Sequence, residues 1–193
     1  MYILGFVGRG GTETEWQGTL EKLNVPYFKF RDEYNHWYLQ EYWKEKLTNF
    51  VKEHGSPTLT FGASMGGWAA LYFQPILKSK HVLAFSPQTT TIPEEMRSFG
   101  AKGKNGRWAT AIESGGYLGC RLPVSDNTST IYYPQIKSIK GNFLKNDGGH
   151  FNLAKELGYN NIIQINDTFD HNVPNVLKER GQLLNVFKSY IAT

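Results

Sequence analysis

The sequence has little that would indicate a disulfide framework or a membrane anchor. Cys120 is the only cysteine among 193 residues, so an internal disulfide is impossible, and such a chain suits a reducing cytosol. No apolar run approaches the roughly 18 residues of a membrane-spanning helix. Met1–Val7 lacks the basic start and the cleavage site of a signal peptide. We therefore expect a cytoplasmic protein without stable membrane insertion.

An excess of one charge is also missing. The 21 basic and 17 acidic residues give a net charge of +4 and are spread along the chain, which argues against a nucleic-acid partner. No pair of histidines has the spacing of metal ligands with a supporting carboxylate, so we expect no metal. Hydrophobic residues make up 40% of the chain. This content and length predict a single domain over residues 1–193 with its own core.

What the sequence does contain is an alternation of short apolar segments with longer helical ones. Segments typical of strands are Tyr2–Val7, Val25–Phe30, Thr58–Phe61, His81–Phe85, Thr130–Tyr133 and Asn161–Ile165. Segments typical of helices are Thr14–Leu23, Trp37–Glu53, Met65–Leu77, Gly149–Leu157 and Pro174–Ile191. This order predicts an α/β fold, a mostly parallel sheet of about six strands with helices on both faces. Residues 86–127, rich in Gly, Ser, Thr, Asn and Pro, should form an irregular, cap-like insertion.

The most informative segment is Gly62-Ala63-Ser64-Met65-Gly66, which matches G-x-S-x-G. An apolar, β-prone segment precedes it and an apolar segment typical of a buried helix follows. A sharp turn between strand and helix lifts a serine above a sheet, where its hydroxyl can act as a nucleophile. The serine of such a turn is strained, so its neighbours must be small. Ser64 is therefore the candidate nucleophile.

Two further segments support a site at the same edge of the sheet. Gly8-Arg9-Gly10-Gly11 follows the first predicted strand, and its glycines let the backbone approach a substrate closely. It also begins a dinucleotide-binding fingerprint, but that pattern needs a third glycine where Glu13 stands, so it fails. Asp170-His171-Asn172 follows the last predicted strand and precedes a helix.

On these three segments the chain resembles the α/β-hydrolase family over nearly its whole length. The resemblance implies the strand order 4-3-5-6-7-8 in the family's usual count. The first predicted strand already carries the glycine loop, which indicates a trimmed member that lacks the usual N-terminal antiparallel strands. The loop also lacks the His-Gly pair that is common there.

The resemblance implies a triad in the chain order serine, acid, histidine. His171 is the expected base. Asp147 is the leading acid because it lies between the fifth strand and the helix before the last strand. Asp167 and Asp170, both in the loop that holds the histidine, are the alternatives.

The resemblance also implies an oxyanion hole, with one backbone N–H from Met65 and a second from Arg9 or Gly10. Together these residues predict a serine hydrolase that cleaves small-molecule carboxylic esters or thioesters through an acyl-enzyme, without a cofactor. An acyltransferase or a peptidase with the same triad, or a non-catalytic binding module on the same fold, are the alternatives.

Overall fold

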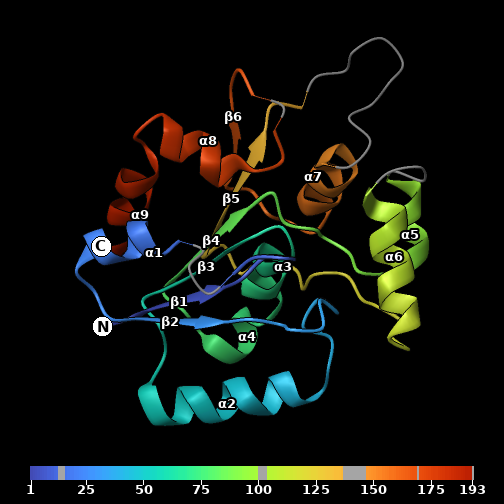
Figure 1. Ribbon diagram of the computed structural model, residues 1–193, viewed down its shortest axis with the longest axis horizontal. Coiled ribbons are helices and arrows are strands. Elements are labelled where there is room, and N and C mark those ends of the chain that lie inside the picture. Colours follow the sequence, from blue (N-terminus) through green and yellow to red (C-terminus); the bar gives the residue numbers. More distant parts are fainter. Residues whose placement is uncertain (13–15, 100–103, 137–146, 169, 193) are drawn as a thin grey trace.

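The computed structural model describes residues 1–12, 16–99, 104–136, 147–168 and 170–192. Its centre is a parallel sheet with the order β2-β1-β3-β4-β5-β6 (Figure 1). The strands are β1 (Ile3–Phe6), β2 (Tyr27–Phe30), β3 (Leu59–Ala63), β4 (His81–Phe85), β5 (Ser129–Pro134) and β6 (Ile162–Ile165). Every neighbouring pair is parallel. The predicted fold class and strand order are thus confirmed.

Helices cover both faces of the sheet. One face carries α2 (Tyr42–His54), α3 (Met65–Tyr72), α4 (Gln74–Leu77) and α7 (Asp147–Glu156), and the other carries α1 (Gln17–Leu20), α8 (Val173–Glu179) and α9 (Leu183–Ile191). Side chains of β4 show why two layers are needed. Val82 and Ala84 lie in the core beneath α2, α3, α4 and α7, here called the first core. Leu83 and Phe85 lie in the second core, beneath α1, α8 and α9. Successive side chains of a strand point to opposite faces, so an apolar strand needs cover on both.

The helix predicted from Trp37 begins only at Tyr42. Trp37 and Tyr38 both have a φ of 56°, in the left-handed region. The Asp32 carboxylate stabilises this conformation, because it accepts hydrogen bonds from the backbone N–H groups of His36 and Tyr38 at 2.7 and 3.0 Å. The aromatic side chains of this turn still enter the core, where Trp37 and Tyr38 are fully buried.

Two other predicted helices are each divided. Between α3 and α4 the chain turns at Phe73, and Pro75 follows without an N–H to continue the ladder. Between α8 and α9 the break lies at Gly181, whose φ is 69°. Of the predicted helix 14–23, residues 14 and 15 lie outside the described part, and α1 and a 3-10 turn, η1 (Glu21–Leu23), follow.

The segment 86–127 is more regular than expected. It contains α5 (Pro93–Ser98) and α6 (Lys104–Ser114), which lie side by side (Figure 1). Met96 of α5 and Ile112 of α6 are buried in the first core. Residues 100–103 lie outside the described part, and the cap-like role of the segment stays a prediction. None of the helices in the described ranges combines the length and the hydropathy that a membrane-spanning segment requires.

Candidate active site

Ser64 stands at a strained turn between β3 and α3. Its φ and ψ are 53° and −118°, a conformation that side chains rarely adopt. The flanking glycines have no space for a side chain. A Cβ on Gly62 would lie 2.3 Å from the carbonyl carbon of Gly66, and a Cβ on Gly66 would lie 2.2 Å from the carbonyl oxygen of Phe6. The turn therefore sits tightly against the carboxyl end of β1, as the G-x-S-x-G pattern predicts.

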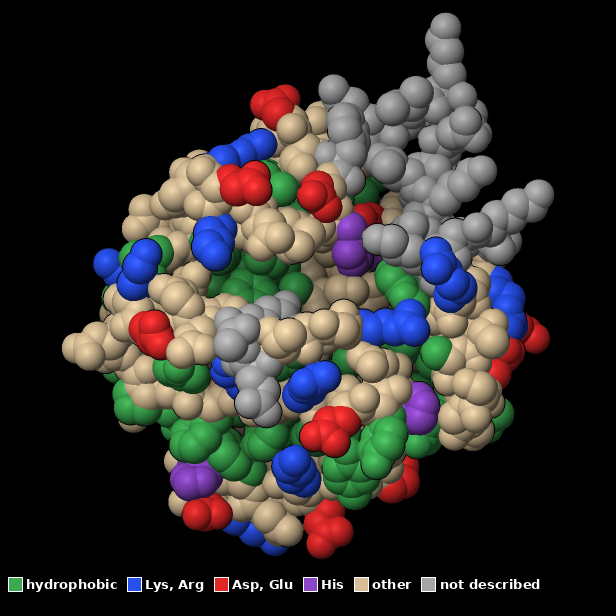
Figure 2. All heavy atoms as spheres, viewed as in Figure 1, with side chains coloured by type: hydrophobic (Ala, Val, Ile, Leu, Met, Phe, Trp, Pro, Cys, Tyr) green, Lys and Arg blue, Asp and Glu red, His purple; other side chains and the backbone are tan. Residues whose placement is uncertain are grey.

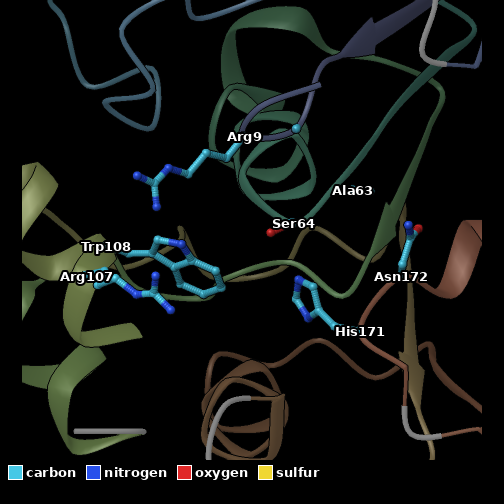
Figure 3. A pocket seen from close by; sticks show the side chains of 8 residues that line it. Arg9, Ala63, Ser64, Arg107, Trp108, His171 and Asn172 are labelled. Atoms are coloured by element: carbon cyan, nitrogen blue, oxygen red, sulfur yellow. The ribbon is translucent and has the colours of Figure 1, made fainter. Parts of the chain in front are cut away.

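A histidine and an aspartate from distant segments meet beside this turn. His171 precedes α8, and Asp147 is the first residue of α7; their Nδ1 and Oδ1 atoms are 2.7 Å apart. A neutral imidazole that donates from Nδ1 keeps its lone pair on Nε2. Nε2 is buried and has no hydrogen-bond partner within the described structure. Figure 3 shows the imidazole ring turned toward Ser64, so this lone pair can serve as a base.

Among the described residues, no hydrogen bond joins the carboxylate of either alternative acid to the His171 ring. Asp170 uses its Oδ1 to accept from the N–H of Asn172 at 2.9 Å, so it stabilises its own loop. Asp167 is exposed, and its backbone N–H donates to Gln135. Of the three candidates, the geometry favours Asp147.

Gln88 is a site residue that the sequence reasoning missed. It is fully buried just after β4, and its Nε2 donates to Ser64 Oγ at 3.1 Å. Its Oε1 accepts from the indole N–H of Trp37 at 3.3 Å, which fixes the amide orientation. The described hydrogen bonds thus pair the hydroxyl of Ser64 with Gln88 rather than with His171. Hydrogen bonds of a catalytic serine are often incomplete before substrate binds. Only its position in the sequence could have indicated this role. Gln88 follows β4, which pairs with β3, so it lies at the same edge of the sheet as Ser64.

The candidate donors for an oxyanion are backbone N–H groups near the serine. Met65 begins α3, so its N–H lies at the positive end of the helix dipole. Of the two further candidates, Gly10 already donates its N–H to Asn35 Oδ1 at 3.1 Å. This bond favours Arg9 over Gly10 as the second donor. Gly8 and Arg9 line the same cavity as Ser64.

The cavity at this site has a volume of about 430 Å³ and opens on the face shown in Figure 2. Its lining residues come from four parts of the chain: Gly8, Arg9, Ala63, Ser64, Arg107, Trp108, His171 and Asn172 (Figure 3). Arg107 and Trp108 belong to α6, so the segment 86–127 contributes to the wall. No cluster of three or more His, Cys, Asp or Glu side chains that could hold a metal occurs in the described ranges.

His150 holds the loop of Gln88 against the helix of Asp147. It is buried, and its Nδ1 accepts from the backbone N–H of Thr89 at 3.1 Å. Burial lowers the pKa of His150 to about 4, since a charged imidazole loses its hydration there. His150 is therefore neutral at pH 7, and its contact with Thr89 connects two segments that border the site.

Comparison by sequence and by structure gave different results. No family model matches the chain, and no curated protein sequence matches it. Solved structures do match. RedJ with a PEG molecule bound in its active site is 14% identical, with a TM-score of 0.60 over 98% of this chain and 91% of that one.

The NocB thioesterase domain, in covalent complex with a fluorophosphonate nocardicin G analog, is 11% identical. The match has a TM-score of 0.57 and covers 100% of this chain and 95% of that one. This chain has the α/β-hydrolase fold.

A third match lies in a longer chain. A chain of the Glycosylation Associate Protein (Gap123) complex from Streptococcus agalactiae is 12% identical, with a TM-score of 0.64. The match covers 100% of this chain and 42% of that one. At identities this low, similarity shows the fold, and the activity must be argued from the site itself.

Proposed function

We propose that this protein is a serine hydrolase that cleaves carboxylic esters or thioesters through an acyl-enzyme on Ser64. The observation that carries the proposal is the 2.7 Å contact of Asp147 with His171, because His171 lines the same cavity as Ser64 on its strained turn. A weak hydroxyl nucleophile needs such a base, held by a third group.

Acylation of Ser64 proceeds through a tetrahedral intermediate. The Ser64 hydroxyl leaves Gln88, and its oxygen attacks the carbonyl carbon while Nε2 of His171 takes the proton. Backbone N–H groups of Met65 and Arg9 donate to the oxyanion of the tetrahedral intermediate. His171 then passes its proton to the leaving oxygen or sulfur, the carbon–oxygen or carbon–sulfur bond breaks, and the acyl group stays on Ser64. Asp147 holds the imidazole and stabilises its charged form.

Deacylation repeats these steps with water. His171 takes a proton from the water, its oxygen attacks the acyl carbon, and the proton returns to Ser64 as the carboxylic acid leaves. No cofactor is required. The structurally similar NocB domain is a thioesterase in covalent complex with a fluorophosphonate analog. This similarity supports a thioester or an ester as the substrate class proposed here.

A panel of p-nitrophenyl esters of rising chain length, together with acyl thioesters, tests the proposal. Ser64→Ala should lower kcat by about a thousandfold or more. Ser189→Ala is the matched control, because Ser189 lies on α9 and its hydroxyl donates to the carbonyl oxygen of Val186 in the same helix. Full activity of Ser64→Ala would contradict the proposal. Faster product formation with added alcohol or amine, at the expense of hydrolysis, would indicate an acyltransferase.

A further inference from the structure

Two arginines share one side of the catalytic cavity. Arg9 follows β1 and Arg107 lies on α6, and Figure 3 shows both side chains on the side of Ser64 that faces Trp108, away from Asn172. Neither guanidinium takes part in the ion pairs found among the described residues. No Asp or Glu is among the residues that line the cavity. Within the described ranges, the positive charge at this mouth therefore has no carboxylate partner in an ion pair.

Both arginines are exposed residues, so solvent screens much of the repulsion between their charges. Partial desolvation of Arg9, followed by the charge of Arg107, still lowers the pKa of Arg9, because both effects disfavour its positive charge. The position is nevertheless built into the fold. The guanidinium carbon of Arg9 lies 5.7 Å from the centre of the Trp37 ring, and the Trp37 and Trp108 rings are 5.9 Å apart. Stacking of this kind orders an arginine before its ligand arrives.

From this geometry we infer that the cavity binds substrates that carry an oxyanion group, a carboxylate or a phosphate, between Arg9 and Arg107. Guanidinium groups bind such oxyanions through paired, charge-assisted hydrogen bonds. The bound anion places the ester or thioester carbonyl at Ser64 and relieves the repulsion between the two arginines. This inference rests on the proposed function of Ser64 and adds the substrate class to it.

The carboxylate arm compares mono-p-nitrophenyl glutarate with its methyl ester, which differ by one negative charge. Wild-type protein should favour the free carboxylate in kcat/KM by about tenfold, the effect of charge-assisted hydrogen bonds at a partly exposed site. Arg107→Gln should remove most of this preference, and Arg107→Lys should retain part of it. Arg31→Gln, the same charge change at an exposed residue outside the cavity lining, should leave the preference unchanged.

The phosphate arm compares the butyryl ester of glycerol 3-phosphate with that of glycerol. A larger preference in this pair than in the glutarate pair would identify a phosphate as the group that is bound, and the reverse order would identify a carboxylate. In either case the preference should fall as salt is raised from 0.05 to about 0.5 M, because salt screens exposed charges.

A binding measurement separates this inference from the proposed hydrolase activity. Glutarate and phenyl phosphate are titrated into Ser64→Ala protein by calorimetry, with and without Arg107→Gln, and affinity should fall about tenfold in the double variant. Cleavage of neutral esters without any anion preference would overturn the anion site and leave the hydrolase proposal intact. If no ester is cleaved, the hydrolase proposal fails, and the calorimetry alone decides whether the arginines bind anions. Equal affinity of the two variants would overturn the site.

Discussion

The buried His150 should make the stability of this protein fall as the pH is lowered from 7 to 4. Its Nδ1 accepts from the Thr89 N–H, so in the folded state the proton of the neutral ring is on Nε2. Protonation would place an N–H against the Thr89 N–H inside the core. Burial is the largest cause of the lowered pKa, and the charge of His171 adds to it, whereas Asp147 and Glu95 oppose it.

The magnitude follows from the shift. The pKa falls from 6.5 to about 4 on folding, so below pH 6.5 the unfolded chain binds a proton that the folded protein rejects. Stability that is present above pH 6.5 is therefore lost as the pH falls toward 4. At 1.36 kcal/mol per pKa unit the loss from this one group is about 3 kcal/mol, a large share of the total stability of a typical domain.

Urea titrations at pH 7, 5.5 and 4, followed by tryptophan fluorescence, measure this loss. His150→Asn keeps an acceptor near the position of Nδ1 but cannot be protonated, so its stability should decrease about 3 kcal/mol less than that of wild type between pH 7 and 4. His150→Gln carries its oxygen too far out to reach the Thr89 N–H and should be less stable than His150→Asn at every pH. Parallel pH profiles for wild type and His150→Asn would refute the reasoning.

Three further outcomes are expected. Asp147→Asn should lower kcat by about 10³ to 10⁴-fold because His171 would then be held in the wrong tautomer, whereas Asp170→Asn should stay within about threefold; the reverse result in ester assays would make Asp170 the acid. Gly66→Ala should lower the unfolding free energy by more than about 2 kcal/mol, since its Cβ meets a backbone oxygen at 2.2 Å, while Gly18→Ala, whose Cβ has open space, should leave the Tm unchanged or raise it. Gln88→Met should lower the unfolding free energy by about 1–3 kcal/mol, because a buried indole N–H loses its acceptor; an unchanged urea midpoint would contradict this.

The sheet could be predicted because its information is local. Each strand is a short apolar segment bounded by turn residues, and the order of elements in a parallel sheet limits the possible topologies. The start of α2 could not be predicted from periodicity. Trp37 and Tyr38 fit a helical pattern. The Asp32 carboxylate instead accepts a hydrogen bond from the Tyr38 N–H, and Gln88 accepts one from the Trp37 indole. Such contacts depend on the finished fold.

The candidate site divides in the same way. Ser64 lies in a motif whose strained backbone requires small neighbours, which the flanking glycines provide. His171 follows a strand at the same edge of the sheet. Both residues could therefore be named as candidates from the sequence. Gln88 and Arg107 carry no motif. Their places depend on how the segment 86–127 folds back over the sheet, and its composition predicted an irregular structure instead of α5 and α6.

Reaction with a fluorophosphonate probe tests the central claim most directly, because the probe needs an activated serine and no knowledge of the natural substrate. Intact mass and peptide mapping should show one label, on Ser64, in the folded protein. Ser64→Ala and urea-unfolded protein should stay unlabelled, and His171→Ala should react far more slowly, since the hydroxyl loses its base. A folded protein that leaves Ser64 unlabelled, or that reacts equally well without His171, would contradict the account.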